Sequence, residues 1–186
     1  MSPLRRSWTR FEGRVMFTLD ASVHVNALNP AEHGSPESQQ LLAQLEALRC
    51  PIFVPTLLLV EISGAVTRST DDAAQGMGGA QRVRNTAGYT WVPLDDFLTQ
   101  EAVRMAATRR LRGADAVYAA VAKRYDCKLV TRDQQQLDRL KGAVTCLTPE
   151  EALAQLSSPA HPATGAQEND SHAPAPTEAQ PQCTAQ

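Results

Sequence analysis

The feature that most restricts how this chain can fold is a set of four acidic residues embedded in apolar sequence. Each lies within or directly beside an apolar run that carries no Lys or Arg, and the four are Asp20, Glu61, Asp115 and Asp133. Removing a carboxylate from water costs several kcal/mol unless a partner compensates its charge. Carboxylate oxygens are the ligands that Mg²⁺ and Mn²⁺ prefer, so the simplest arrangement gathers all four acids around shared divalent cations.

Short apolar runs alternate with helical patterns along most of the chain. Strands are predicted over Val15–Leu19, Ile52–Val54, Tyr89–Val92, Cys127–Thr131 and Ala143–Leu147. Five helices are predicted with both ends, namely Ser22 (as N-cap) to Asn29, Pro36–Leu48, Ala114–Arg124, Gln134–Leu140 and Pro149 to Leu156. Three more are predicted by where they begin: one opens at Thr56 and carries Glu61, one begins at Asp71 or Asp72, and one begins at Asp95. The apolar face of the helix from Asp95 is predicted to include Phe97, Val103, Met105 and Ala106. This alternation predicts an α/β fold, a three-layer α/β/α sandwich with a mainly parallel central sheet.

The four acids are expected to meet at one edge of that sheet, because ligands bind beyond the carboxyl ends of parallel strands. Asp20 directly follows the first strand, and Asp133 lies two residues beyond Thr131 at the end of another. Two divalent ions roughly 4 Å apart can activate water and stabilise the leaving oxygen in phosphodiester hydrolysis. The hydroxyls of Ser22 and Thr131 could support these ligands or contact a phosphate, and ordinary helix capping is an equal alternative.

Each acid also has a plain structural interpretation when it is taken alone. Asp20 fits a turn at a strand end, Asp115 a helix start and Asp133 an N-cap. Glu61 resists such an interpretation, because it lies in a helix interior among Leu and Ile, where an acid has no capping role.

Charge is unevenly distributed along the 186 residues, a length that fits one domain with an accessory tail. All 18 Lys and Arg lie before Glu151, whereas four of the 20 Asp and Glu lie from Glu151 onward. With four acids in one pocket, the rest of the domain surface would be basic and suited to a polyanionic substrate; an ordinary mixed-charge surface is the alternative.

Cysteine usage and hydropathy exclude several classes of protein. Cys50, Cys127, Cys146 and Cys183 lack the close spacing of a zinc or redox motif, and Cys127 and Cys146 are predicted to be small core residues. No apolar stretch follows the N-terminal arginines as a secretory signal requires, and no run of 18 apolar residues could span a membrane. We therefore expect a cytoplasmic protein.

The two ends of the chain are expected to lie outside the folded domain of residues 14–156. Residues 1–13 are interpreted as an N-terminal extension, and translation from Met16 would place the first strand at the start of the protein. Residues 157–186 are rich in Pro, Ala and Gln and hold no large apolar side chain, so this segment is predicted to be a disordered tail.

Four segments carry the acids in a fixed order: Leu19-Asp20-Ala21-Ser22-Val23, Val60-Glu61-Ile62, Gly113 to Ala122, and Leu129-Val130-Thr131-Arg132-Asp133. Over roughly residues 14–150 the chain resembles PIN-domain nucleases, in particular the VapC-type toxin ribonucleases of toxin–antitoxin pairs. The resemblance implies a Mg²⁺- or Mn²⁺-dependent endoribonuclease that dimerises and is inhibited by a cognate antitoxin peptide in its cleft. It also implies that Asp20, Glu61, Asp115 and Asp133 are the catalytic metal ligands.

Two features depart from the family pattern, namely the proline-rich tail and the glycine-rich stretch Gln75–Ala80. The glycines are expected to weaken a helix that in relatives helps form the dimer or the antitoxin groove. Three alternatives remain open at this point: a PIN fold that binds RNA or protein without cleaving, a housekeeping RNA-processing nuclease, and a phosphatase. The phosphatase is disfavoured because Ser22 stands where the second acid of an Asp-x-Asp motif would be.

Other polar residues are assigned smaller roles. Asp95 and Asp96 are interpreted as a helix start, Asp138 as a residue on the wrong side of its helix, and His24 as a packed or surface histidine. The arginines before Asp115 could guide RNA phosphates or form a solvated helix face. They are Arg104, Arg109, Arg110 and Arg112.

Overall fold

The computed structural model describes residues 14–157, so the predictions for the N-terminal extension and for the tail beyond Ser157 lie outside the described residues. The strands are β1 (Phe17–Leu19), β2 (Ile52–Pro55), β3 (Tyr89–Val92), β4 (Lys128–Val130) and β5 (Cys146–Leu147). The helices are α1 (Ala21–Leu28), α2 (Ser35–Ala47), α3 (Leu57–Thr70), α4 (Ala73–Arg84), α5 (Asp96–Arg109), α6 (Gly113–Tyr125), α7 (Gln134–Arg139) and α8 (Pro149–Ser157).

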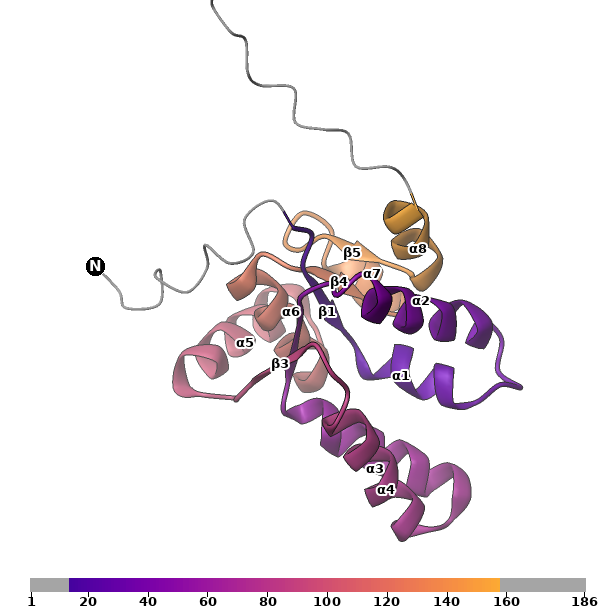
Figure 1. The fold of residues 1–186 in the computed structure, drawn as a ribbon. Coiled ribbons are helices and arrows are strands. Elements are labelled where there is room, and N and C mark those ends of the chain that lie inside the picture. Colours follow the sequence, from indigo (N-terminus) through magenta and orange to yellow (C-terminus); the bar gives the residue numbers. More distant parts are fainter. Residues whose placement is uncertain (1–13, 158–186) are drawn as a thin grey trace, which may run out of the picture.

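The strands form one sheet in the order β3-β2-β1-β4-β5, and every neighbouring pair is parallel. β1 lies in the middle, with Phe17 opposite Ile52 of β2 and Leu19 opposite Val130 of β4. Figure 1 shows α5 and α6 on one face of the sheet and α1, α2 and α8 on the other, while α3 and α4 pair beside it. The predicted α/β sandwich with a parallel sheet is confirmed.

The core follows from which side chains line these layers. All three residues of β1 are buried, as are Leu129 and Val130 of β4. From Ala116 to Ala122, α6 is buried throughout, because its alanines let the helix approach the sheet closely. Cys127 is buried and Cys146 partly so, and burial raises the pKa of these thiols to about 12 and about 11. In the described part of the chain, every helix falls short of the length and apolar character of a membrane span.

Aspartates begin several helices and thereby fix where those helices start. Their carboxylates accept hydrogen bonds from first-turn backbone N–H groups, and they are Asp20 for α1, Asp72 for α4, Asp95 for α5 and Asp133 for α7. The prediction that Ser22 caps the first helix is wrong. Asp20 is the residue in extended conformation before α1, and it accepts the Ser22 N–H at 3.3 Å, which places Ser22 inside the first turn.

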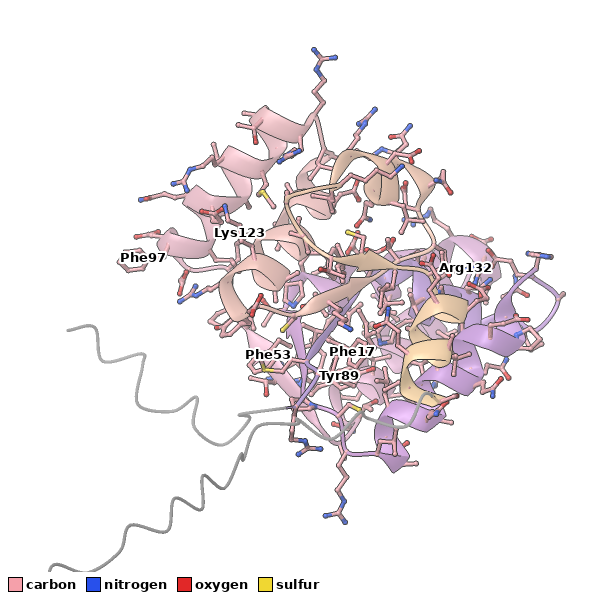
Figure 2. All side chains as sticks on the ribbon, turned by 90° about the horizontal axis from the view of Figure 1, so that it is seen from above. Phe17, Phe53, Tyr89, Phe97, Lys123 and Arg132 are labelled. Carbon is pink, nitrogen blue, oxygen red and sulfur yellow. The ribbon has the colours of Figure 1, made fainter. Side chains whose placement is uncertain are left out.

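The predicted apolar face of α5 is also partly wrong. Phe97 is 76% exposed and Val103 63% exposed, and Figure 2 shows Phe97 at the outer edge of the molecule. The buried residues of α5 are instead Leu98, Ala102 and Met105. These three follow the i, i+4, i+7 spacing of a single helix face, and α5 packs against α6.

The glycine-rich stretch Gln75–Ala80 lies inside a continuous helix, α4, so it does not interrupt the chain. Gly76 and Gly79 are the buried residues of this helix. A methyl group on Gly76 would come within 2.0 Å of the Thr67 hydroxyl oxygen and 2.7 Å of the Ser63 carbonyl oxygen, both on α3. The missing side chain therefore lets α3 and α4 pack closely.

Candidate active site

The candidate active site lies where the strand order of the sheet reverses, between β1 and β4. The chain moves outward from β1 to β2 and β3, and then returns to place β4 on the other side of β1. Such a reversal opens a crevice at the carboxyl ends of the two strands. Asp20 follows β1 and Asp133 follows β4, and the backbone N–H of Asp20 bonds the carbonyl oxygen of Val130 at 3.0 Å.

Asp20 is held by two hydroxyl groups. Ser22 Oγ lies 2.6 Å and Thr131 Oγ1 3.1 Å from Oδ2 of Asp20, and both hydroxyls donate to it. Asp20 is only 5% exposed. The Thr131 hydroxyl also accepts the backbone N–H of Asp133 at 3.0 Å, so one side chain orients two of the predicted acids. Ser22 and Thr131 therefore both contact Asp20, and their role as supports of metal ligands stays a prediction.

Glu61 is held by a residue that sequence reasoning missed. The hydroxyl of Tyr118, a fully buried residue of α6, donates a 2.5 Å hydrogen bond to Oε2 of Glu61 on α3. The available sequence signal is that Tyr118 lies three residues after Asp115, on the same helix face.

Asp115 lies in the first turn of α6 and is held by a second missed residue. Gln136 of α7 donates from Nε2 to Oδ1 of Asp115 at 3.2 Å, and the backbone N–H of Arg112 bonds the same carboxyl group. Asp133 accepts the backbone N–H groups of Gln135 and Gln136 on its Oδ1, at 2.7 and 3.2 Å. Hydrogen bonds to neutral donors thus orient all four carboxyl groups.

The four acids influence one another electrostatically. Burial raises the pKa of Glu61, and the charges of Asp20 and Asp115 raise it further, against the lowering effect of the Tyr118 hydrogen bond. Burial is also the main cause of the raised pKa of Asp115, with added contributions from Asp20 and Asp133. Within residues 14–157, none of the ion pairs involves Asp20, Glu61 or Asp115. The fold therefore gathers four acids from distant parts of the sequence and leaves most of their charge without a cationic partner.

The comparison with known families agrees with this geometry. A family model described as the PIN domain matches residues 17–143, more than half of the chain. The chain belongs to the PIN domain family. All four acids of this PIN domain lie inside the matched range, as do Tyr118 and Gln136.

Several solved structures have the same PIN fold. PAE2754 from Pyrobaculum aerophilum is 23% identical, with a TM-score of 0.57, covering 78% of this chain and 97% of that one. VapC20 from Mycobacterium tuberculosis, described as a Sarcin-Ricin loop cleaving toxin, is 15% identical with a TM-score of 0.56, covering 69% and 96%. A toxin–antitoxin complex from Klebsiella pneumoniae is 18% identical with a TM-score of 0.51, covering 73% and 97%. A comparison with curated proteins finds no match.

The donor groups of this PIN domain fit a hard divalent cation. Four carboxyl groups supply oxygen ligands, and the neutral donors that hold them leave their negative charge available to a metal. In the part of the chain that the structure describes, no three of the Asp, Glu, His or Cys side chains form a ready-made metal cage. Carboxylates that repel one another stay apart, so binding an ion would require some of these side chains to turn toward it.

Several of the remaining candidates of the PIN domain have structural roles. His24 is buried between the Asp20 carbonyl oxygen at 3.3 Å and the Tyr89 hydroxyl at 2.8 Å, so Nδ1 donates and Nε2 accepts. Asp95 caps α5 and pairs with Arg124, and Asp138 pairs with Lys141. Of the arginines before Asp115, Arg104 pairs with Glu101, whereas Arg112 lies 3.8 Å from Asp133.

Proposed function

We propose that this protein is a Mg²⁺- or Mn²⁺-dependent endoribonuclease and the toxin component of a type II toxin–antitoxin system. The observation that carries the proposal is the gathering of Asp20, Glu61, Asp115 and Asp133 beside the strand-order reversal of a PIN domain. A partly buried group of acids with little cationic compensation is expensive to maintain unless the site uses it.

In the proposed reaction the four carboxylates hold one or two divalent ions. Those ions supply the activation of water and the charge stabilisation that phosphodiester hydrolysis needs. The protein's own contribution is orientation. Ser22 and Thr131 hold Asp20, and Tyr118 holds Glu61, so the orientations of these two acids are restricted before metal and substrate arrive.

Arg112 is the proposed contact for an RNA phosphate next to the acids. Its side chain is 70% exposed, and its guanidinium lies 3.8 Å from Oδ2 of Asp133. An exposed ion pair of this kind contributes at most about 1 kcal/mol, so Arg112 can exchange Asp133 for a phosphate at little cost. Guanidinium groups bind phosphates through paired N–H donors, which suits this role.

A protein partner is part of the proposal. VapC20 and the Klebsiella pneumoniae complex, described as a toxin and as a toxin–antitoxin complex, share the fold. The proposed antitoxin segment occupies the cleft beside the four acids. A separate groove of about 960 Å³, with Arg14, Ile52 and Tyr89 among its lining residues, lies at the opposite end of the strands and is not assigned to it. A homodimer and a cytoplasmic location belong to the same proposal.

The test uses purified protein on RNA and on a generic phosphate ester, each with Mg²⁺, with Mn²⁺ and with chelator. We expect metal-dependent internal cleavage of RNA and no turnover of the ester. Asp20→Asn should abolish cleavage, whereas Asp138→Asn, at an exposed acid that pairs with Lys141, should leave it unchanged. Ester turnover would indicate a phosphatase. Expression of the protein in cells provides a second readout. If the Asp20→Asn variant still arrested growth, the protein would act as a binding module and not as a nuclease.

A further inference from the structure

Gln136 occupies an unusual position between two of the acids. Its backbone N–H donates to Oδ1 of Asp133 at 3.2 Å, and its side-chain Nε2 donates to Oδ1 of Asp115, also at 3.2 Å. The residue is only 1% exposed. One residue of α7 therefore contacts a carboxyl group that follows β4 and another that begins α6.

Stability alone does not explain a glutamine at this place. Oε1 of Gln136 is buried, and none of the described residues donates a hydrogen bond to it. A buried acceptor without a partner destabilises a folded protein, whereas an apolar side chain of similar length would avoid that loss. Because Nε2 faces a carboxylate, the amide orientation is fixed and Oε1 points away from Asp115.

The neutral charge of the amide suits this position. Asp115 already faces the negative charges of Asp20 and Asp133. A fifth acid would add to that repulsion, and a lysine or arginine would compete with a cation for Asp115. An amide donor orients Asp115 and leaves the carboxylate charge in place.

We propose that Gln136 is a positioning residue that fixes Asp115 relative to Asp133 for divalent cation binding. The inference rests on the proposed function for its chemistry. It assigns to Gln136 the orientation of Oδ1 of Asp115, a ligand of intermediate exposure. Partners of this kind typically change metal affinity by about 10- to 100-fold when they are removed.

The chain supplies a closely matched control, because Gln135 is the exposed neighbour of Gln136 on the same helix. We would compare Gln136→Glu, Gln136→Leu and Gln135→Glu by calorimetric titration with Mn²⁺ and by steady-state RNA cleavage. Gln136→Glu places an acceptor opposite Oδ1 of Asp115, and Gln136→Leu removes the donor without adding charge. Gln135→Glu adds the same charge one residue away.

We expect Mn²⁺ to bind about 10-fold or more weakly to both Gln136 variants and normally to Gln135→Glu. At a fixed, limiting Mn²⁺ concentration, kcat should fall in the Gln136 variants while KM for RNA stays constant. Excess Mn²⁺ should restore cleavage by Gln136→Leu. Circular dichroism verifies folding, and Gln136→Leu is expected to fold because it removes the unpartnered acceptor.

Two results would overturn the inference. The first is wild-type Mn²⁺ affinity in Gln136→Leu, and the second is an equal loss in Gln135→Glu and Gln136→Glu, which would assign the effect to charge on α7. If the wild-type protein bound Mn²⁺ but did not cleave RNA, that result would refute the proposed function and not the inference on Gln136. The calorimetric series would still decide the role of Gln136 in that case.

Discussion

The Tyr118 hydroxyl donates a 2.5 Å hydrogen bond to Oε2 of Glu61, although the two residues are 57 positions apart in the sequence. This bond joins α6 to α3 and gives an acid in a helix interior a fixed orientation. It also lowers the pKa of Glu61, in opposition to burial and to the neighbouring acids, which raise it.

Replacing Tyr118 with Phe should therefore lower both stability and activity. A hydrogen bond to a charged group contributes about 1.5–3 kcal/mol, and its loss leaves the Glu61 carboxylate less compensated. We expect a lower urea midpoint and RNA cleavage reduced by about 10-fold or more, as for partners that orient metal ligands. Tyr89→Phe is the control, because it removes a hydrogen bond to neutral His24 and touches no acid. Equal losses of cleavage in the two variants would contradict the assignment.

Asp115→Asn should change stability in opposite directions without and with metal. Burial and, after it, the like charges of Asp20 and Asp133 raise the pKa of Asp115, so removing its charge relieves both desolvation and repulsion. In chelator we expect a variant that is more stable than the wild type by about 1 kcal/mol. Saturating Mn²⁺, at about 100 times its Kd, should stabilise the wild type by about 2.7 kcal/mol and the variant far less. Thermal unfolding with and without Mn²⁺ measures both effects, and equal gains from Mn²⁺ would exclude Asp115 as a ligand.

Acidification should destabilise the fold through His24. Burial lowers the pKa of His24 from 6.5 to about 4, so the unfolded chain binds a proton that the folded protein excludes. Stability from this group is fully present above about pH 6.5 and falls as the pH drops toward 4, by about 3 kcal/mol in total.

Glu61 and Asp115 oppose this trend in metal-free protein. Their pKa values are raised on folding, so their protonation favours the folded state as the pH falls from their raised pKa values toward the ordinary ones. Urea unfolding of wild type and His24→Asn between pH 7 and 4.5 separates the contributions. We expect the acid-side loss to disappear in His24→Asn and to persist in His33→Asn, at an exposed histidine. Parallel pH profiles for wild type and His24→Asn would refute the assignment.

Neighbouring glycines of α4 should respond differently to alanine. Gly76→Ala forces a methyl group against Thr67 and Ser63 of α3 and should destabilise the protein by about 1–3 kcal/mol. The matched variant Gly78→Ala would meet only the flexible end of Arg82 at 3.5 Å, and should stabilise α4 by up to about 1 kcal/mol. Urea midpoints measure both changes. If Gly76→Ala left the free energy of unfolding unchanged, α3 and α4 could move apart without loss of stability, which would contradict this prediction.

The four acids were predictable from sequence because their signal is local: each is a charge in an apolar run. The order of strands and helices was predictable for the same reason. Tyr118 and Gln136 were not, because each becomes significant only through a partner on another helix. Tyr118 lies in an alanine-rich stretch where a tyrosine is also an ordinary core residue, and Gln136 lies in a run of three glutamines with no pattern to separate them.

The errors have similar physical causes. Asp20 and Ser22 are both good N-caps two residues apart, and only the end of β1 decides between them. For α5, the apolar character of Phe97 and Val103 suggested burial, whereas the buried set Leu98, Ala102 and Met105 follows helix periodicity. Spacing was the better guide to this helix than apolar character.

The two hydrogen bonds of Thr131 restrict which residues evolution can place at this position. Its Oγ1 donates a hydrogen bond to Asp20 and accepts one from the backbone N–H of Asp133. Valine would match its shape but would remove one of the two hydroxyl groups on Asp20 and the acceptor of the Asp133 N–H at once, so we expect substitutions here to be limited to serine. In a sequence alignment of the family, the position of Thr131 should therefore hold Thr or Ser wherever both neighbouring acids are present. Other residues should occur there only in sequences that also lack the acids.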